Sequence, residues 1–221
     1  MNFIQRQGFD QNAVEDLGKY YLVEKDVLFP KDPTRYDFSL GKHYEHGSLL
    51  ADTRVIVRSG NELPEVWKGA LEDAMGHWNS ITNSRLTFEL GAEEHLLIQS
   101  DGGLLPWDVM AAAVFPCTAA PGPIIYVNTD FKPCGGVTAD RAEYSMAHQL
   151  GHCLGFTHAS WLGHGEAVRE EEGNVIGNAM NRRAADPQSI MARRGHCTTW
   201  SGFSGSDINA LETAYPRSTA D

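Results

Sequence analysis

Residues 146–158 read MAHQLGHCLGFTH and contain three histidines, at positions 148, 152 and 158. His148 and His152 are four residues apart, so on a helix they lie on one face, where both imidazoles can reach a single metal ion. Gly155 can take the positive φ that ends a helix and reverses the chain. His158 can then return as a third nitrogen donor and leave the fourth position of a tetrahedral zinc site open for water. Such an open position is typical of a catalytic zinc site.

The residue that follows the first histidine is Gln149, at the position where an HExxH zinc site carries glutamate. That glutamate takes a proton from the zinc-bound water and later passes it to the leaving amine. An amide has nearly the same shape but no usable basicity, so metal binding should survive and peptide cleavage should be severely slowed. Two explanations stay open. One is a substitution introduced to stop self-digestion, which the otherwise intact motif favours; the other is a natural pseudoenzyme that keeps its metal.

The composition predicts a globular protein with one domain, or one domain and an appended segment: 42% of the 221 residues are apolar and 21% are charged. The net charge of -11 argues against nucleic acid or an anionic membrane surface as a partner, because no basic stripe is present to meet phosphates. No apolar run approaches the roughly 20 residues that cross a bilayer. Residues 1–6 lack the apolar core of a signal peptide, so in an exported protein the signal would already have been removed.

Four cysteines form an even set with no CxxC pair: Cys117, Cys134, Cys153 and Cys197. We expect two disulfides, in which Cys117 pairs with Cys134 and Cys153 pairs with Cys197. The second bridge would tie the histidine-bearing helix to the C-terminal segment. Each bridge would stabilise the fold by about 2–4 kcal/mol. Four reduced, buried cysteines in a cytosolic protein are the alternative.

The remaining sequence divides into a leader, residues 1–45, and an α/β core. Pro30 and Pro33 limit both helix formation and ladder pairing in the leader, as in a linker or a cleavable arm. Residues 163–187 are polar and hold several glycines, which predicts a long surface loop.

The core should hold three helices. Apolar residues recur at helical spacing from about Pro64 to Ile81, which predicts a backing helix. The histidine-bearing helix should open with a capping box of Asp140 and Glu143 and run to about Leu154. A last helix is expected at about Ser206–Ala214. Alternating or short apolar runs predict strands at Val55–Val57, Arg85–Leu90, Leu96–Gln99 and Ile124–Val127.

The histidine motif resembles that of the secreted bacterial metzincins, and most closely the dual-action HEIGH metallopeptidases, whose signature would read HEIGHCLGFxH here. Gln149 and Leu150 depart from that signature. Ser189-Ile190-Met191 resembles the Met-turn of the superfamily, which would make Met191 the apolar floor beneath the three imidazoles. The resemblance runs over residues 8–216. It implies an α/β (α+β) metzincin-like fold: a twisted mixed sheet with a backing helix and a zinc-site helix, and a small irregular C-terminal subdomain that ends in a helix.

Residues 21–27 of the leader read YLVEKDV and are similar to the FxGD aspartate switch of astacin propeptides. Lys25 stands where that motif has glycine. The resemblance implies that Asp26 occupies the open position of the zinc site and displaces the catalytic water, since a carboxylate is a competent zinc ligand.

The sequence therefore predicts a secreted bacterial zinc endopeptidase, present as an inactive, uncleaved zymogen. We expect a monomer with one Zn²⁺, a pro-segment over residues 1–45 and a catalytic domain over residues 46–221 whose upper and lower subdomains meet at about residue 158. Its partners would be a peptide or protein substrate and its own pro-segment, with no nucleic acid and no membrane. Two alternatives stay open: a natural pseudoprotease that binds peptides or proteins through a zinc-containing cleft, and a helical core with incidental histidines that holds no metal.

The other histidines are expected to be surface or structural residues: His43, His46, His77, His95, His164 and His196.

Overall fold

Eight strands form one mixed sheet in the computed structural model of the chain, which describes Ile4 and residues 12–32, 50–116, 120–159, 186–192 and 197–217. The strands are β1 (Val14–Asp16), β2 (Tyr20–Val23), β3 (Val27–Pro30), β4 (Arg54–Ser59), β5 (Thr87–Leu90), β6 (Leu96–Ser100), β7 (Ala111–Val114) and β8 (Ile124–Val127). The helices are α2 (Glu65–Asn79), the 3-10 turn η2 (Pro133–Gly135), α3 (Ala139–Cys153) and α4 (Gly205–Ala214).

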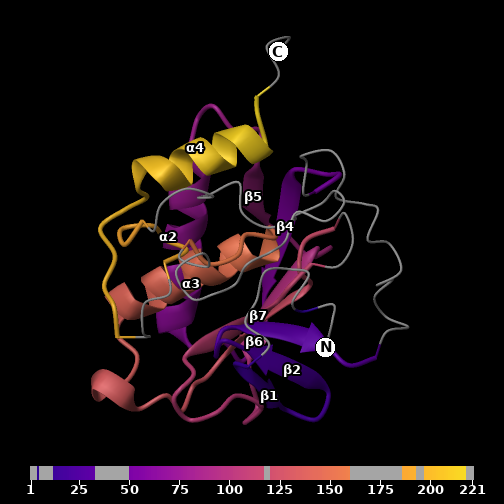
Figure 1. The fold of residues 1–221 in the computed structure, drawn as a ribbon, viewed down its shortest axis with the longest axis vertical. Helices are drawn as coiled ribbons and strands as arrows, with labels where there is room; N and C mark the ends of the chain where they lie inside the picture. The colour runs from indigo at the N-terminus through magenta and orange to yellow at the C-terminus, as the bar shows by residue number, and fades with distance from the viewer. Residues whose placement is uncertain are drawn as a thin grey trace.

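The strand order is β1-β2-β3-β7-β8-β6-β4-β5. Strands β8, β6, β4 and β5 are parallel to one another, and β7 runs antiparallel to β8. On its other side β7 pairs with β3 in parallel, and β3, β2 and β1 continue as an antiparallel meander. The N-terminal strands thus extend the sheet beyond β7, as the indigo arrows in Figure 1 show.

Helix α3 packs across α2, and α4 lies over the end of the same layer (Figure 1). Trp67 and Trp78 of α2 are both at least 99% buried, as their spacing on one helical face predicts. The indole Nε1–H of Trp78 donates to the carbonyl of Ala147 over 3.1 Å, which sets the position of α3 against α2. Tyr215, after α4, donates its hydroxyl to the carbonyl of Leu154 at the end of α3 over 3.1 Å.

The predicted helices and four predicted strands lie within a few residues of the observed α2, α3, α4, β4, β5, β6 and β8. The predicted capping box is wrong. Thr138 is the N-cap of α3 and makes no side-chain cap bond. Glu143 pairs instead with His77 of α2, with 2.9 Å between Oε1 and Nε2, because the packing of the two helices brings the carboxylate to that imidazole. Strand β7, whose alanines show no alternation, was not predicted.

The leader is not a separate linker over its described part, because residues 14–30 pair as three strands of the sheet. Apolar side chains alternate between its two faces, and both faces are covered. Val23, Val27 and Phe29 form one buried cluster with Phe115, and Leu22 and Leu28 join another cluster with Val114. Pro30 is the last residue of β3, where a missing N–H costs little.

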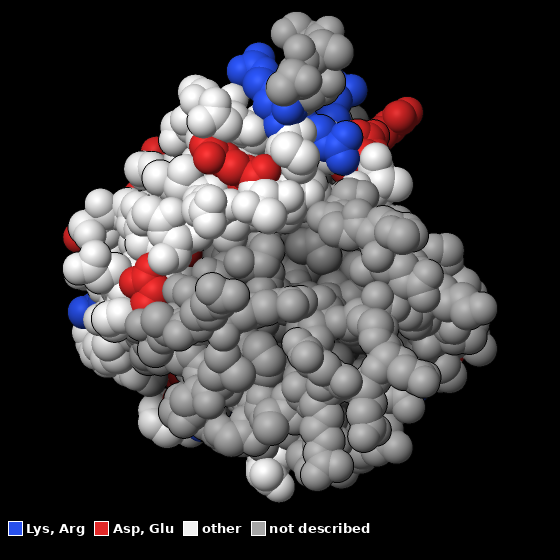
Figure 2. Space-filling view, turned by 45° about the horizontal axis from the view of Figure 1, so that its top comes forward, with Lys and Arg blue, Asp and Glu red and all other residues white. Residues whose placement is uncertain are grey.

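No helix among the described residues is long and apolar enough to cross a membrane. On the face drawn in Figure 2, several basic side chains gather near the top with an acidic group beside them, and a few separate acidic groups and one more basic group lie toward the left.

Candidate metal centre

The end of helix α3 brings the three motif histidines together. His148 and His152 lie on one face of the helix, with 2.9 Å between their Nε2 atoms. Gly155 has φ of 90°. The N–H of Gly155 donates to the carbonyl of His152 over 2.9 Å, and the N–H of Phe156 donates to that of Gly151 over 3.0 Å, the two bonds of a Schellman ending. The reversed chain places Nε2 of His158 3.3 Å from Nε2 of His148.

Each imidazole is oriented by an acceptor on its other nitrogen. Nδ1 of His148 lies 2.6 Å from the carbonyl of Ile190, and Nδ1 of His152 lies 2.8 Å from the carbonyl of Phe156. A carbonyl can only accept, so both Nδ1 atoms carry the proton and both Nε2 lone pairs are free for a metal. Nδ1 of His158 lies 2.6 Å from Oε2 of Glu24.

Asp26 supplies the fourth donor. Its Oδ2 lies 2.7 Å from Nε2 of His148, 2.9 Å from that of His158 and 3.5 Å from that of His152. The four donor atoms all lie within 4.8 Å of one another, and no other group of three or more potential metal ligands of this kind occurs among the described residues. Donors around tetrahedral zinc, with bonds of about 2.0–2.1 Å, are separated by about 3.3 Å. Three imidazoles and one carboxylate at these separations fit one Zn²⁺.

A tight turn between β2 and β3 presents Asp26 to the histidines. Glu24 and Lys25 have φ of 55° and 60°. The N–H of Asp26 donates to the carbonyl of Val23 over 3.1 Å, which closes a turn with two left-handed central residues. Lys25 thus occupies the kind of position that glycine favours, and its ammonium pairs with Asp108 on the outside.

The charges in the cluster support a ligating carboxylate. In the metal-free protein, burial and the His148 ring lower the pKa of His152 to about 4. Burial also lowers the pKa of His158, but the carboxylates of Asp26 and Glu24 outweigh it and raise that pKa to about 9. Burial raises the pKa of Asp26, yet His148 and the other two imidazoles hold it well below its usual range. Asp26 is therefore ionised near neutral pH and can bind a cation.

Gln149 lies beside Asp26 and is 99% buried. Its Nε2 donates to Oδ1 of Asp26, and the carbonyl of Ala111 in β7 lies 3.5 Å from the same nitrogen. Its Oε1 has no hydrogen-bond partner among the described residues. Position 149 therefore faces the same space as the fourth donor, where a general base would meet a metal-bound water.

Met191 packs beneath the histidine helix. A methyl group at Gly151, the residue just before His152, would lie 2.4 Å from Sδ of Met191. The neighbouring Ile190 carbonyl orients His148, and Asp207 of α4 holds this turn: Oδ2 accepts from the N–H of Ile190 over 2.9 Å, and Oδ1 accepts from the hydroxyl of Ser189. Asp207 is fully buried and also completes the capping box of α4.

Asp207→Ala should lower the free energy of unfolding by about 2–4 kcal/mol, because it removes the N3 carboxylate of the α4 capping box and leaves buried donors of the Met191 turn without an acceptor. Denaturant titrations of the metal-free proteins would measure the change. Asp73→Ala, at an exposed position of α2, is the control and should stay within about 0.5 kcal/mol. Equal midpoints for the two variants would contradict this role.

The disulfide prediction is wrong in its pairing. Cys134 of η2 is bonded to Cys197, with 5.9 Å between the Cα atoms. Cys153, at the end of α3, forms no disulfide within the described residues and is fully buried, and burial raises the pKa of its thiol. The part of the chain that carries Cys197 therefore reaches η2 rather than Cys153. Cys117 lies outside the described residues.

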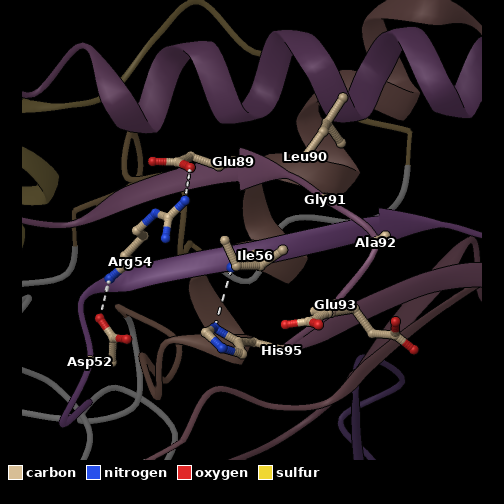
Figure 3. A pocket seen from close by; sticks show the side chains of 10 residues that line it. Asp52, Arg54, Ile56, Glu89, Leu90, Gly91, Ala92, Glu93 and His95 are labelled. Atoms are coloured by element: carbon tan, nitrogen blue, oxygen red, sulfur yellow. Dashed lines mark hydrogen bonds and ion pairs between the residues drawn. The ribbon is translucent and has the colours of Figure 1, made fainter.

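The other histidines of the described part lie outside the metal cluster. His77 pairs with Glu143. His95 accepts from the N–H of Ile56 over 3.3 Å, in a shallow hollow at the β4–β5 edge (Figure 3). At this hollow Arg54 pairs with Glu89 over 2.7 Å. The remaining histidines lie outside the described residues: His43, His46, His164 and His196. Most of the predicted polar loop, residues 163–187, also lies outside them.

His152→Ala should lower the zinc affinity about 10²- to 10³-fold, if each of four ligands contributes a quarter of the roughly 10–16 kcal/mol of a structural zinc site. Metal analysis after dialysis against a weak chelator would measure it, with His95→Ala as the control. Retention of stoichiometric zinc by the His152 variant would contradict the assignment of this cluster.

The sequence did not identify four of the groups that build this site: Glu24, Asp207 and the carbonyls of Phe156 and Ile190. Backbone carbonyls leave no sequence signal. One weak indication of Glu24 was present in the sequence. It stands two residues before Asp26, and a tight turn can bring both of these side chains to the same side of the chain, toward the histidines.

No protein-family model matches the sequence, and no curated protein matches it. Two solved structures of myroilysin are similar in fold. One has a TM-score of 0.50 at 15% identity and covers 78% of this chain and 85% of the myroilysin chain. The other has a TM-score of 0.50 at 12% identity and covers 93% of this chain and 95% of the myroilysin chain. High choriolytic enzyme 1, a hatching enzyme zinc-protease from Oryzias latipes (medaka fish), has a lower TM-score of 0.45 at 15% identity, over 79% of this chain and 94% of its own. At these identities the likeness to myroilysin shows the fold, and the chain has the metzincin-like fold expected from its sequence.

Proposed function

We propose that this chain is the latent precursor of a zinc-dependent endopeptidase whose active form carries glutamate at position 149. One observation carries the proposal: three imidazole nitrogens and a leader carboxylate converge on one point beside residue 149. A site built only to hold zinc would be closed by ligands of its own domain. Here the fourth ligand comes from the N-terminal segment, so cutting that segment would open a coordination position for water.

In the cut protein, His148, His152 and His158 would hold the metal through Nε2. Zinc would polarise the scissile carbonyl and lower the pKa of its water. A glutamate at position 149 would take the proton from that water and give it to the leaving amine. Met191 and Ile190 would keep the imidazoles in place from below.

Strand β7 would bind an extended substrate. In the latent form the N–H of Ala113 donates to the carbonyl of Asp26 and the N–H of Phe115 donates to that of Leu28, both over 3.1 Å. These donors belong to the sheet edge that β3 covers, and they would be free for a peptide backbone after β3 leaves. The leader therefore blocks both the metal and the strand that would align the substrate.

A natural pseudoprotease is the second candidate, and one contact favours it. The amide of Gln149 donates to Asp26, so glutamine suits a permanently capped site better than a second carboxylate would. Such a protein would hold zinc and bind peptides or proteins without cleaving them.

We further propose that the protein is secreted, and that it is a monomer of bacterial origin related to the HEIGH metallopeptidases. The Cys134–Cys197 disulfide supports an oxidising compartment. The motif HQLGHCLGFTH supports the relationship, with Gln149 and Leu150 as its departures.

Proteolysis by the restored protein tests the proposal. The unaltered chain and a Gln149→Glu variant are incubated with an unfolded protein substrate, each with and without a chelator, and followed on a denaturing gel. Chelator-sensitive cleavage by the variant alone would support the peptidase, and loss of an N-terminal fragment would locate the activation site. A variant that binds zinc and stays inert even after its leader is trimmed would favour the binding protein.

A further inference from the structure

The three histidines of the metal site differ in the acceptor that contacts Nδ1 of each ring. His148 and His152 have backbone acceptors from the C-terminal part of the chain and from their own helix end. His158 has a carboxylate acceptor, Glu24, and this residue belongs to the leader. The leader therefore touches both nitrogens of the same imidazole: Asp26 on Nε2 over 2.9 Å and Glu24 on Nδ1 over 2.6 Å.

The contact of Glu24 is buried and fixed. The side chain of Glu24 is 2% exposed and that of His158 is 3% exposed. The N–H of Glu24 donates to the carbonyl of Ala13 over 2.8 Å, and its left-handed φ of 55° belongs to the turn that presents Asp26. One turn thus places two carboxylates on opposite sides of one ring. Burying a second charge there is costly unless it is paired, and Nδ1–H of His158 is its partner.

A carboxylate that accepts from a zinc-bound imidazole fixes the ring and makes it a stronger ligand. When the leader is cut and leaves, His158 loses this acceptor together with the ligand Asp26. Metal binding and leader binding must then strengthen each other by the same factor, because coupling between two binding equilibria is reciprocal.

We propose that Glu24 is a positioning residue that acts through His158 to tighten zinc binding in the uncut form only, so that the leader secures the metal as well as capping it. The proposal rests on the zinc site and the removable leader of the proposed function. It extends the role of the leader to a residue that does not touch the metal.

Zinc affinity, measured by competition with a chromogenic chelator, tests the role without any assay of cleavage. Glu24→Ala in the full-length chain should weaken zinc binding about 10- to 100-fold, the usual effect of losing such a partner. Glu24→Gln keeps an acceptor oxygen and the size of the side chain, so its loss should be smaller. The matched control is Glu15→Ala, at an exposed position of β1 in the same leader, which should leave the affinity unchanged.

A second measurement confirms that the effect belongs to the leader. Once the leader is cut and removed, the protein made from the Glu24→Ala variant is chemically identical to the one made from the unaltered chain, so the difference in zinc affinity should vanish. A difference that persists after removal would mean that the variant had folded wrongly, and it would overturn the inference.

An equal affinity of the uncut Glu24→Ala and Glu15→Ala proteins would also overturn the inference, and it would leave the proposed function standing. Should Glu24→Ala not fold, the comparison of Glu24→Gln with Glu15→Gln decides it. If the unaltered chain holds no stoichiometric zinc, the proposed function itself fails.

Discussion

A Gln149→Glu protein whose leader has been cut away should cleave an unfolded peptide about 10²- to 10⁴-fold faster than the unaltered chain cut in the same way, which is the usual contribution of a positioned general base. The side chain at 149 is buried and directed at the point where the fourth donor lies. A carboxylate there could take the proton of a bound water, whereas the amide of Gln149 cannot. Initial rates on a quenched peptide, with a chelator control, would measure the gain.

The matched control is Gln188→Glu, the same chemical change at an exposed position near the Met191 turn. It should leave the residual rate unchanged. Equal rates for the Gln149→Glu and Gln188→Glu proteins, both loaded with zinc, would contradict a catalytic role for position 149.

The same substitution should loosen the leader in the uncut protein. Nε2 of Gln149 now donates to Oδ1 of Asp26, and a carboxylate at 149 would replace this donor with a second negative charge. Two carboxylates in contact cannot both ionise without cost. Faster proteolytic removal of the leader from the Gln149→Glu protein would follow from this repulsion.

Replacing Asp26 with alanine in the uncut Gln149→Glu protein should raise its activity about 10²- to 10⁴-fold, although not to the rate of the cut protein, because β3 still covers β7. Removing one partner of a buried charge contact typically costs about 3–5 kcal/mol, and each 1.4 kcal/mol is about a factor of ten. Asp26 contacts all three histidines and its side chain is only 13% exposed, so its loss opens the fourth position and weakens the hold of the turn.

The ratio of the rates before and after leader removal measures this latency. Asp16→Ala, an exposed acidic position in β1 of the same leader, is the control and should preserve the full ratio. A silent, uncut Asp26→Ala protein would contradict this role of the cap and show that the pairing of β3 with β7 is sufficient to block the cleft.

The spacing of His148, His152, Gly155 and His158 was sufficient to predict the three converging nitrogens, because helical geometry and one left-handed glycine act locally. The backing helix and four strands were equally readable, since their apolar residues recur with the period of their own element. The strands of the leader were not. Pro30 and Pro33 indicated a linker, but β3 pairs with β7, which is distant in the sequence, and burial on both faces outweighs the local preference.

The disulfide and the capping box failed for the same reason. Four cysteines allow several pairings, and only the path of the C-terminal segment brings Cys197 to Cys134 rather than to Cys153. Glu143 has the spacing of a capping residue, but a neighbouring helix offers it His77 at 2.9 Å.

The sequence by itself determined the metal-binding helix, the residue expected to act as base and the Met191 turn, because each depends on a short run of residues and on local backbone geometry. The resemblance of residues 21–27 to an aspartate switch also pointed to Asp26 as the fourth donor. Only the tertiary structure decided that Glu24 reaches His158 from the same turn, that Asp207 supports the Met191 turn, and that the leader is a part of the sheet. These contacts join parts of the chain that are distant in sequence, and they form because burying the apolar faces of β2 and β3 against β7 brings the polar ends of the turn to the metal site.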